Sequence, residues 1–246
     1  MTANLTLLRT LALVVRVAPY GEGHAVVTFM TESFGLVAAL ARGARKPSRR
    51  LAPLEPFHTL AITLAPLANL AVNHGDLGTL HEAALVCPRL TLVTSLDALC
   101  ASGTVLRWAR HLFPPRTPEP DGWRTLVDFL DALDARTLAP GPAMVTAGLR
   151  LLAAAGYALD FVRCVRCGTG CPESRPAFVD PYLGGLICRA CGGTGQTFGP
   201  ELRRAAQAAS VSGHALSIEH AGVLLAFVDK ALAAHAGVAK SAKQPV

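Results

Sequence analysis

The first eighty residues contain short runs of apolar and β-branched residues, separated by segments of turn-forming residues. Residues 10–18 alternate, residues 25–31 form a β-branched run, and residues 36–41 form a third apolar run. The segments between them, 19–23 and 33–35, are rich in Gly, Pro and Ser. Because side chains of a strand point alternately to its two faces, this pattern predicts three strands joined by tight turns.

Two further runs, residues 57–64 and 67–73, are separated by Pro66. Proline is poorly tolerated inside a sheet, and here the prolines and glycines fall between the runs. Five short strands in about 75 residues are typical of a small closed barrel. We therefore expect residues 1–80 to form a β-barrel of the OB type.

From Glu82 onward apolar residues recur at helical spacing as far as Phe113. Further helices are predicted to open near Asp121, at residues 140–142, at Pro200 and from Ser217. Residues 161–197 are rich in Cys, Gly and Pro and follow neither period. The predicted fold class is therefore α+β and multidomain. Its three parts are an OB-fold domain (1–80), an α-helical domain (81–160 and 198–246) and an inserted cysteine-rich module (161–197).

The composition excludes several classes of protein. Of the 246 residues, 51% are hydrophobic and 16% are charged, which is not the composition of a disordered chain. The mean hydropathy of +0.38 raises the question of a membrane protein. The longest charge-free stretch, residues 56–75, contains two prolines and indicates two strands rather than a spanning helix. With no signal peptide visible, we expect a cytoplasmic protein.

Four of the seven cysteines form two C-x-x-C pairs twenty residues apart. Two such turns can complete a tetrahedral site of four thiolates, the arrangement typical of structural zinc. Residues 161–197 are therefore predicted to form a zinc-ribbon-like module with four cysteine ligands. The predicted ligands of one zinc ion are Cys164, Cys167, Cys188 and Cys191, with Cys171 as a possible substitute. A redox dithiol is less favoured, because that motif normally occurs singly before a helix. Cys87 and Cys100 are expected to be buried on apolar helical faces.

Positive charge is concentrated near the N-terminus. Residues 1–50 carry seven Lys and Arg against two Glu, a net charge of +5. Five of these cations lie within residues 42–50, which follow the third predicted strand and which we call the basic loop. Such an asymmetry favours a polyanionic partner, although a solvated loop with no partner remains open. Because aromatic residues are few in the barrel, we expect contacts to the phosphate backbone rather than to bases.

Catalytic motifs are largely missing from the sequence. His81 and Glu82 begin like a zincin helix, but Leu85 stands where the second histidine is needed. The Gly-rich residues 192–197 lack the lysine of a phosphate-binding loop, and there is no G-x-S-x-G. We therefore expect a protein that is not an enzyme.

Several segments, in order, resemble the bacterial RecO family of recombination mediators. Residues 13–22 are similar to its first hairpin, and residues 31–36 and 41–46 resemble its T-x-x-x-G and A-K-G-A-R segments. Further matches are residues 54–57, 149–157 and the G-G-x-x-C segment at 184–188. Two departures, Arg42 in place of a lysine and the interruption by Pro47, leave the role of individual loop cations open.

This resemblance implies a bacterial, nucleoid-associated, non-enzymatic protein of DNA repair and recombination, acting after DNA damage in the RecFOR pathway. Its residues 1–80 would be an OB-fold DNA-binding domain that binds single- and double-stranded DNA. It would anneal complementary strands, and with RecR help RecA onto DNA coated by single-strand binding protein. The tail of that protein would dock on the helical part, at Arg107, Arg110 or Arg150. The expected DNA-binding residues are Arg16, Arg42, Arg45, Lys46, Arg49 and Arg50.

Two other functions stay open. A zinc-ribbon RNA-binding or transcription-associated protein would use residues 161–197 as its contact surface. An uncharacterised hydrolase would need a convergent acid–base site, which nuclease and NTPase assays with Mg²⁺ would reveal.

Overall fold

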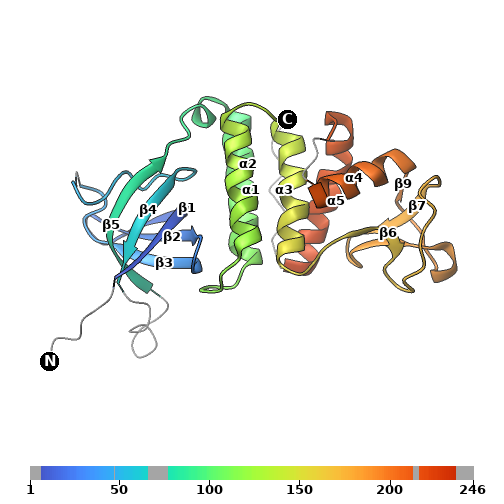
Figure 1. Cartoon of the computed structure of the whole chain (residues 1–246), viewed down its shortest axis with the longest axis horizontal. Helices are drawn as coiled ribbons and strands as arrows, with labels where there is room; N and C mark the ends of the chain where they lie inside the picture. Colours follow the sequence, from blue (N-terminus) through green and yellow to red (C-terminus); the bar gives the residue numbers. More distant parts are fainter. Residues whose placement is uncertain (1–6, 47, 66–76, 213–215, 237–246) are drawn as a thin grey trace. The chain divides into compact units, whose positions relative to one another are not determined.

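The computed structural model describes residues 7–46, 48–65, 77–212 and 216–236 (Figure 1). The chain divides into two compact units. One consists of Met1–Leu90 with Phe113–Trp123, and the other of Thr91–Leu112 with Arg124–Val246. We call them the barrel unit and the helical unit and describe them in turn.

The barrel unit contains a closed five-stranded barrel of the OB type. Its strands are β1 (Leu8–Tyr20), β2 (His24–Thr31), β3 (Gly35–Ala41), β4 (Thr59–Leu64) and β5 (Leu77–Cys87). They close in the order β1-β2-β3-β5-β4, with β3 and β5 parallel and the other pairs antiparallel. The predicted OB-type barrel and its first four strands are confirmed.

The fifth strand differs from the prediction. The run at 67–73 lies outside the described residues. The helical pattern expected from Glu82 to Phe113 is wrong at its start, because Leu77–Cys87 is a strand, and is confirmed for Leu96–Leu112, which is a helix. The sequence around Ala83 and Ala84 favours a helix on propensity, but this segment closes the barrel. It pairs with β3 on one side and β4 on the other, and Leu80 and Ala83 are buried inside. The strand therefore continues past the boundary predicted at residue 80.

The barrel core follows the period-two pattern of the strands. Val27 and Phe29 of β2 are fully buried, and Val37 and Ala39 of β3 and Leu60 of β4 pack with them. Many of the inward positions are small, with alanines at 12, 25, 39 and 41. Such residues fit a narrow barrel, whose interior side chains must fill without crowding.

The turn between β2 and β3 is tied to a later part of the chain. The Thr31 hydroxyl donates to the Gly35 carbonyl (2.8 Å) and accepts the N–H of Phe34 (3.0 Å). The Arg116 N–H donates to the Leu36 carbonyl at 2.9 Å. Residues 113–123 thus form part of the barrel unit although α1 separates them from the barrel in sequence.

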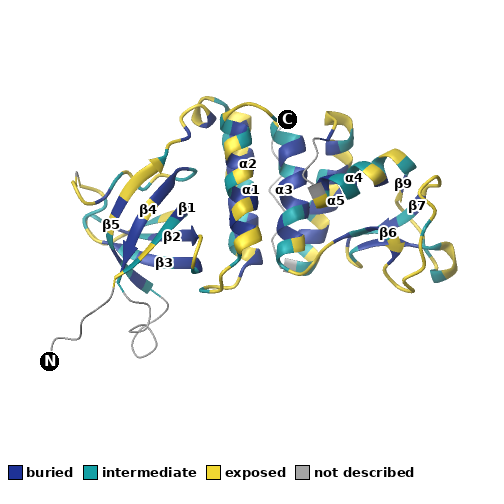
Figure 2. Cartoon of the chain, viewed as in Figure 1, coloured by how far each residue is buried: buried dark blue, intermediate teal, exposed yellow. Residues whose placement is uncertain are grey.

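The helical unit carries the helices predicted from Pro140, Pro200 and Ser217. Most residues of α3 are buried or half-buried, in agreement with the blue and teal ribbon in Figure 2. Within the described ranges, no helix is long and apolar enough to span a membrane. The helices are α1 (Leu96–Leu112), α2 (Pro120–Asp134, whose first turn counts with the barrel unit), α3 (Pro140–Ala154), α4 (Pro200–Ser212) and α5 (Ile218–Ala236).

The cysteine-rich segment is a small sheet rather than an irregular loop. It comprises β6 (Asp160–Cys164), β7 (Ala177–Asp180), β8 (Gly185–Ile187) and β9 (Thr197–Phe198), in the order β6-β8-β7-β9. We call residues 160–198 the cysteine module. Its strands are too short to give a readable period, which is why the sequence did not predict them.

Candidate nucleic-acid interface and metal centre

The basic loop starts directly after β3 and packs against the turn between β1 and β2. The Gly43 N–H donates to Nδ1 of His24 at 3.0 Å, and the Arg45 N–H donates to the Gly23 carbonyl at 3.2 Å. The Lys46 N–H closes a turn onto the Gly43 carbonyl (3.0 Å). These bonds hold the first three loop cations beside the β1–β2 turn.

The other end of the basic loop is fixed to β5. The Arg50 carbonyl accepts the Ala83 N–H (2.9 Å), and the Ala52 N–H donates to the Ala83 carbonyl (2.8 Å). The Arg50 guanidinium donates to the His81 carbonyl at 3.3 Å. Main-chain bonds at both ends therefore anchor the loop to the barrel.

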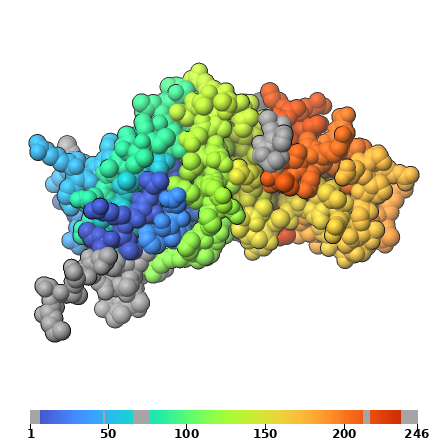
Figure 3. All heavy atoms as spheres, in the orientation of Figure 1, coloured from blue at the N-terminus to red at the C-terminus, as the bar shows by residue number. Residues whose placement is uncertain are grey.

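All six predicted DNA-binding side chains are exposed. None of them forms an ion pair with an acidic side chain in the ranges that the structure covers. Figure 3 shows the sky-blue segment around residue 50 projecting from the barrel surface. Arg16 lies apart from the loop in sequence, on β1 opposite Thr28 and next to a β-bulge. The positive charge is thus displayed to solvent rather than neutralised internally.

The aromatic residues of the barrel differ in exposure. Phe29 is fully buried, and Phe34 packs against the core. Tyr20, by contrast, is 56% exposed at the end of β1, directly opposite His24 on β2. Sequence reasoning missed this difference. The available signal was the position of Tyr20 beside the Gly21–Gly23 turn, where a ring cannot reach the core.

The four cysteines of the two C-x-x-C pairs come together. The sulfur atoms of Cys164, Cys167, Cys188 and Cys191 all lie within 4.8 Å of one another. Cys167 Sγ and Cys188 Sγ are 3.8 Å apart. Four thiolates around a tetrahedral zinc at about 2.3 Å would be separated by about 3.8 Å. The donor set and its spacing therefore fit a metal ion of this type.

Two short turns present these thiols. The first turn follows β6. The second turn follows β8 and contains one turn of 3-10 helix, Arg189–Cys191. Gly168 and Gly192 end the two turns with φ of +72° and +79°, a conformation that side chains disfavour. The Arg166 guanidinium donates to the Cys191 carbonyl at 2.9 Å and so ties the two turns together.

The backbone around the thiols favours a thiolate. The Cys188 N–H points to Cys164 Sγ (3.4 Å) and, against the effect of burial, lowers the pKa of Cys164 to about 6. Hydrogen bonds from Thr169 lower the pKa of Cys167. Bonding to Cys188 and Cys167 raises the pKa of Cys191 to about 12, because neighbouring thiols cannot all ionise without a cation. A bound metal ion would supply that charge.

The remaining cysteines lie outside this cluster. Cys171 is not among the four clustered thiols, and burial raises its pKa. Cys100 is exposed on α1 and Cys87 is half-buried at the end of β5, so the prediction that both are buried on helical faces is wrong. Within the described residues, no other group of His, Cys, Asp or Glu side chains is close enough to hold a metal.

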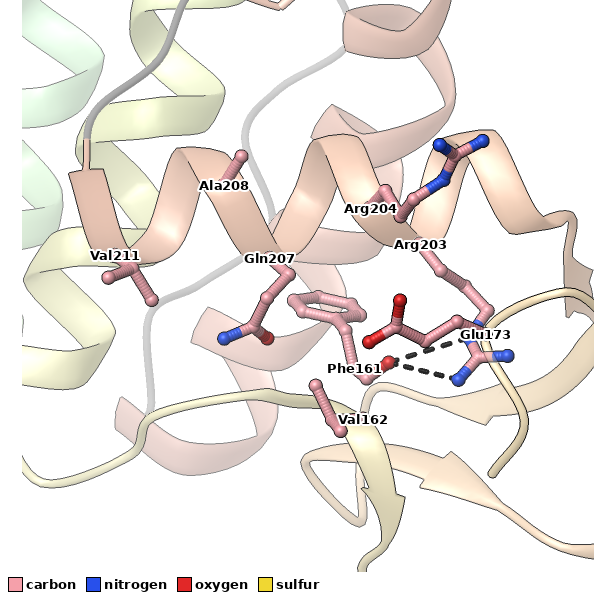
Figure 4. A pocket seen from close by; sticks show the side chains of 8 residues that line it. All are labelled: Phe161, Val162, Glu173, Arg203, Arg204, Gln207, Ala208 and Val211. Atoms are coloured by element: carbon pink, nitrogen blue, oxygen red, sulfur yellow. Dashed lines mark hydrogen bonds between the residues drawn. The ribbon is translucent and has the colours of Figure 1, made fainter. Parts of the chain in front are cut away.

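One buried arginine joins the cysteine module to α4. Arg203 is only 2% exposed, and its guanidinium donates to the carbonyls of Phe161, Cys171, Pro172 and Arg175 at 2.7–3.4 Å. Figure 4 shows it beside a pocket of about 400 Å³ between α4 and β6. Arg203 therefore supplies hydrogen-bond donors to main-chain carbonyls at the junction of α4 and the cysteine module. Sequence reasoning missed this residue.

No zincin helix forms at His81 and Glu82, which lie on β5.

The sequence of this chain matches the models of a known protein family. A family model described as "Recombination protein O N terminal" matches residues 5–89, and "Recombination protein O C terminal" matches residues 93–237.

Curated relatives agree with these matches, and each is named DNA repair protein RecO. The relative from Nocardioides sp. is 34% identical over 75% of this chain and 74% of its own length. The relative from Myxococcus xanthus is 35% identical over 74% and 71%. The relative from Geobacter metallireducens is 28% identical over 92% and 91%. With both family models matched in order along almost the whole length, this chain belongs to the RecO family.

Proposed function

We propose that this protein is a DNA repair and recombination mediator that binds single- and double-stranded DNA through its barrel. It anneals complementary strands and, with RecR, assists the loading of RecA onto DNA covered by single-strand binding protein. The observation that carries the proposal is the basic loop of an OB-type barrel, with exposed cations that no described acidic side chain neutralises. It acts by binding, without catalysis, in the bacterial cytoplasm.

The physical basis of annealing is charge neutralisation. Two phosphate chains repel each other, and a surface that neutralises both lets complementary bases meet. Each phosphate contact on single-stranded DNA contributes about 0.7 to the slope of log affinity against log salt, so five loop cations give a slope of at most roughly −3.5. Such binding is independent of sequence, as a mediator of repair requires.

We also propose that the cysteine module holds one structural zinc ion through Cys164, Cys167, Cys188 and Cys191. Four protein ligands leave no position for a substrate or water, so the ion would stabilise the fold rather than take part in chemistry.

For the acidic tail of single-strand binding protein we propose the pocket between α2 and α3. It has a volume of about 280 Å³, and its lining includes the apolar residues Phe129 and Leu138 and the ion pair of Arg150 with Asp128 (3.2 Å). Arg150 is half-buried and Asp128 is exposed, and a pair that is open to solvent is weak, so a peptide carboxylate can replace Asp128. Of the three arginines considered, Arg150 is the one that lines this pocket.

The test of DNA binding is charge reversal in the basic loop. Changing Arg42, Arg45 and Arg49 to Glu should weaken DNA binding at least tenfold and reduce the magnitude of the salt slope by about 2. Fluorescence anisotropy with labelled oligonucleotides at several salt concentrations measures both. Annealing of complementary oligonucleotides, with and without single-strand binding protein, should slow in parallel.

A matched control changes Arg163, Arg175 and Arg189 to Glu. All three are exposed on the cysteine module, and the change in net charge is identical. Binding should stay within about twofold of the wild type. If this control loses binding and the loop variant keeps it, the cysteine module is the contact surface, and the zinc-ribbon alternative replaces our proposal.

A further inference from the structure

Two polar side chains, Tyr20 and His24, lie next to each other at the tip of the first hairpin. Tyr20 and His24 are directly opposite each other on β1 and β2, so their side chains share one face of the sheet. Ala25, the next residue, points into the core, which places Tyr20 and His24 on the outer face. Arg42 follows Ala41, the partner of Ala25 on β3.

The hydrogen bond to Gly43 fixes the role of His24. Nδ1 accepts the Gly43 N–H (3.0 Å), so a neutral imidazole must carry its proton on Nε2. No described residue accepts a hydrogen bond from Nε2. His24 therefore positions the basic loop with one ring nitrogen and offers a donor with the other.

The loop cations lie beside the same tip. The Arg45 N–H is bonded to the Gly23 carbonyl, and the Lys46 side chain runs so close to Gly23 that a Cβ there would lie 3.4 Å from Lys46 Cε. An exposed aromatic ring, a neutral donor and loop cations thus meet at one end of the barrel.

We propose that Tyr20 and His24 form a single-strand-reading site, in which the Tyr20 ring stacks on an unpaired base while His24 Nε2–H donates to the adjoining phosphate. This inference rests on the proposed DNA-binding function and goes beyond it, because cations alone bind any phosphate chain. The face of a base is accessible only when the base is unstacked, so a stacking ring distinguishes single strands from a duplex. Tyr20 would therefore make this surface bind single-stranded DNA more tightly than a duplex.

The experiment compares ring-removing and ring-keeping variants on three ligands. The ligands are oligo-dT, a strand of abasic sites of equal length, and a duplex. Tyr20→Leu should weaken binding to oligo-dT roughly tenfold, the scale of one lost base–aromatic stack, while Tyr20→Phe stays near the wild type. Affinity for the duplex and for the abasic strand should change by less than about twofold, and the salt slope should be unchanged, because no charge is lost.

Tyr182→Leu is the matched control, since Tyr182 is 59% exposed but lies in the cysteine module, and it should leave all three affinities unchanged. Tyr20→Trp gives a direct readout. Trp108 and Trp123 are 1% and 6% exposed, so a new exposed indole should dominate the quenching by oligo-dT. Absence of quenching by oligo-dT would contradict stacking.

His24 is tested by two substitutions. His24→Asn can keep an acceptor for the Gly43 N–H but removes the Nε2 donor, and should weaken binding to all three ligands by a few-fold. His24→Leu removes both and should weaken it further, because the loop loses an anchor. If Tyr20→Leu weakens oligo-dT and duplex equally, or not at all, the site is refuted while the DNA-binding function stands. If the wild type shows no salt-dependent binding, both fail.

Discussion

At two glycines of the motifs that resemble the RecO family, a nearby main-chain carbonyl leaves no space for a side chain. Gly35 has φ of +66°, and a Cβ there would overlap the carbonyl of Thr117. Gly185 has φ of +153°, and a Cβ would overlap the carbonyl of Asp160. In both cases the conformation and the lack of space exclude a side chain. The glycine of T-x-x-x-G and the second glycine of G-G-x-x-C thus serve packing rather than binding.

This account predicts different costs for two similar substitutions. Gly43 has φ of +73° but open space around its Cβ position, so Gly43→Ala should cost only about 1 kcal/mol of backbone strain. Gly35→Ala adds a clash with main chain and should cost clearly more, roughly 3 kcal/mol. Urea unfolding of the two variants measures the difference. Equal losses would show that the contact with residues 113–123 does not constrain Gly35.

Arg203 gives a second prediction at this scale. Arg203→Met removes the guanidinium donor from four main-chain carbonyls, of which that of Pro172 keeps the N–H of Arg175, and should lower the free energy of unfolding by about 3 kcal/mol. Its neighbour Arg204 is exposed, so Arg204→Met should stay within about 0.5 kcal/mol. Urea unfolding with the metal content held constant compares them. Similar values for both would contradict the tethering role of Arg203.

At the scale of elements, the sequence predicted those strands and turns whose structure depends on residues close together in the chain. The first four strands were predicted because each is a short apolar, β-branched or alternating run bounded by turn residues. The cysteine tetrad was predicted because two C-x-x-C turns can together supply four zinc ligands. β5 was not predicted, since its residues favour a helix and only pairing with β3 and β4 makes them a strand. Arg203 was not predicted for the same reason. Its partners are main-chain carbonyls some 30 to 40 residues away, and every residue has such a carbonyl, so the sequence does not indicate which of them accept the bonds.

The two cysteine turns predict the metal stoichiometry of variants. Elemental analysis should find about one zinc per wild-type chain. Cys188→Ser should lose most of it and lower the thermal midpoint, because a hydroxyl is a poor zinc ligand and three thiolates bind weakly. Cys171→Ser should retain one zinc, since its sulfur is not part of the cluster. If Cys188→Ser retained zinc and Cys171→Ser lost it, Cys171 rather than Cys188 would be the fourth zinc ligand.

For the whole molecule, the separation into two compact units has a functional consequence. The basic loop and the cysteine module belong to different units. Removing the metal with a strong chelator should therefore destabilise the helical unit but leave the affinity for oligo-dT within about twofold. Anisotropy titrations before and after chelation, with circular dichroism as the check on folding, measure this. A parallel loss of affinity and metal would mean that the module contributes directly to DNA binding.

The return of residues 113–123 to the barrel unit also bears on how this protein is made. Domains tend to fold as they leave the ribosome, from the N-terminus onward. Here the last strand of the barrel ends at Cys87, yet the partner of Leu36 is not synthesised until Arg116. During translation, the Leu36 carbonyl after the β2–β3 turn therefore lacks its bond to the Arg116 N–H until α1 and Arg116 have been synthesised. A fragment that ends at Leu90 lacks residues 113–123, which belong to the barrel unit. An expression fragment meant to isolate the barrel should therefore extend through Trp123.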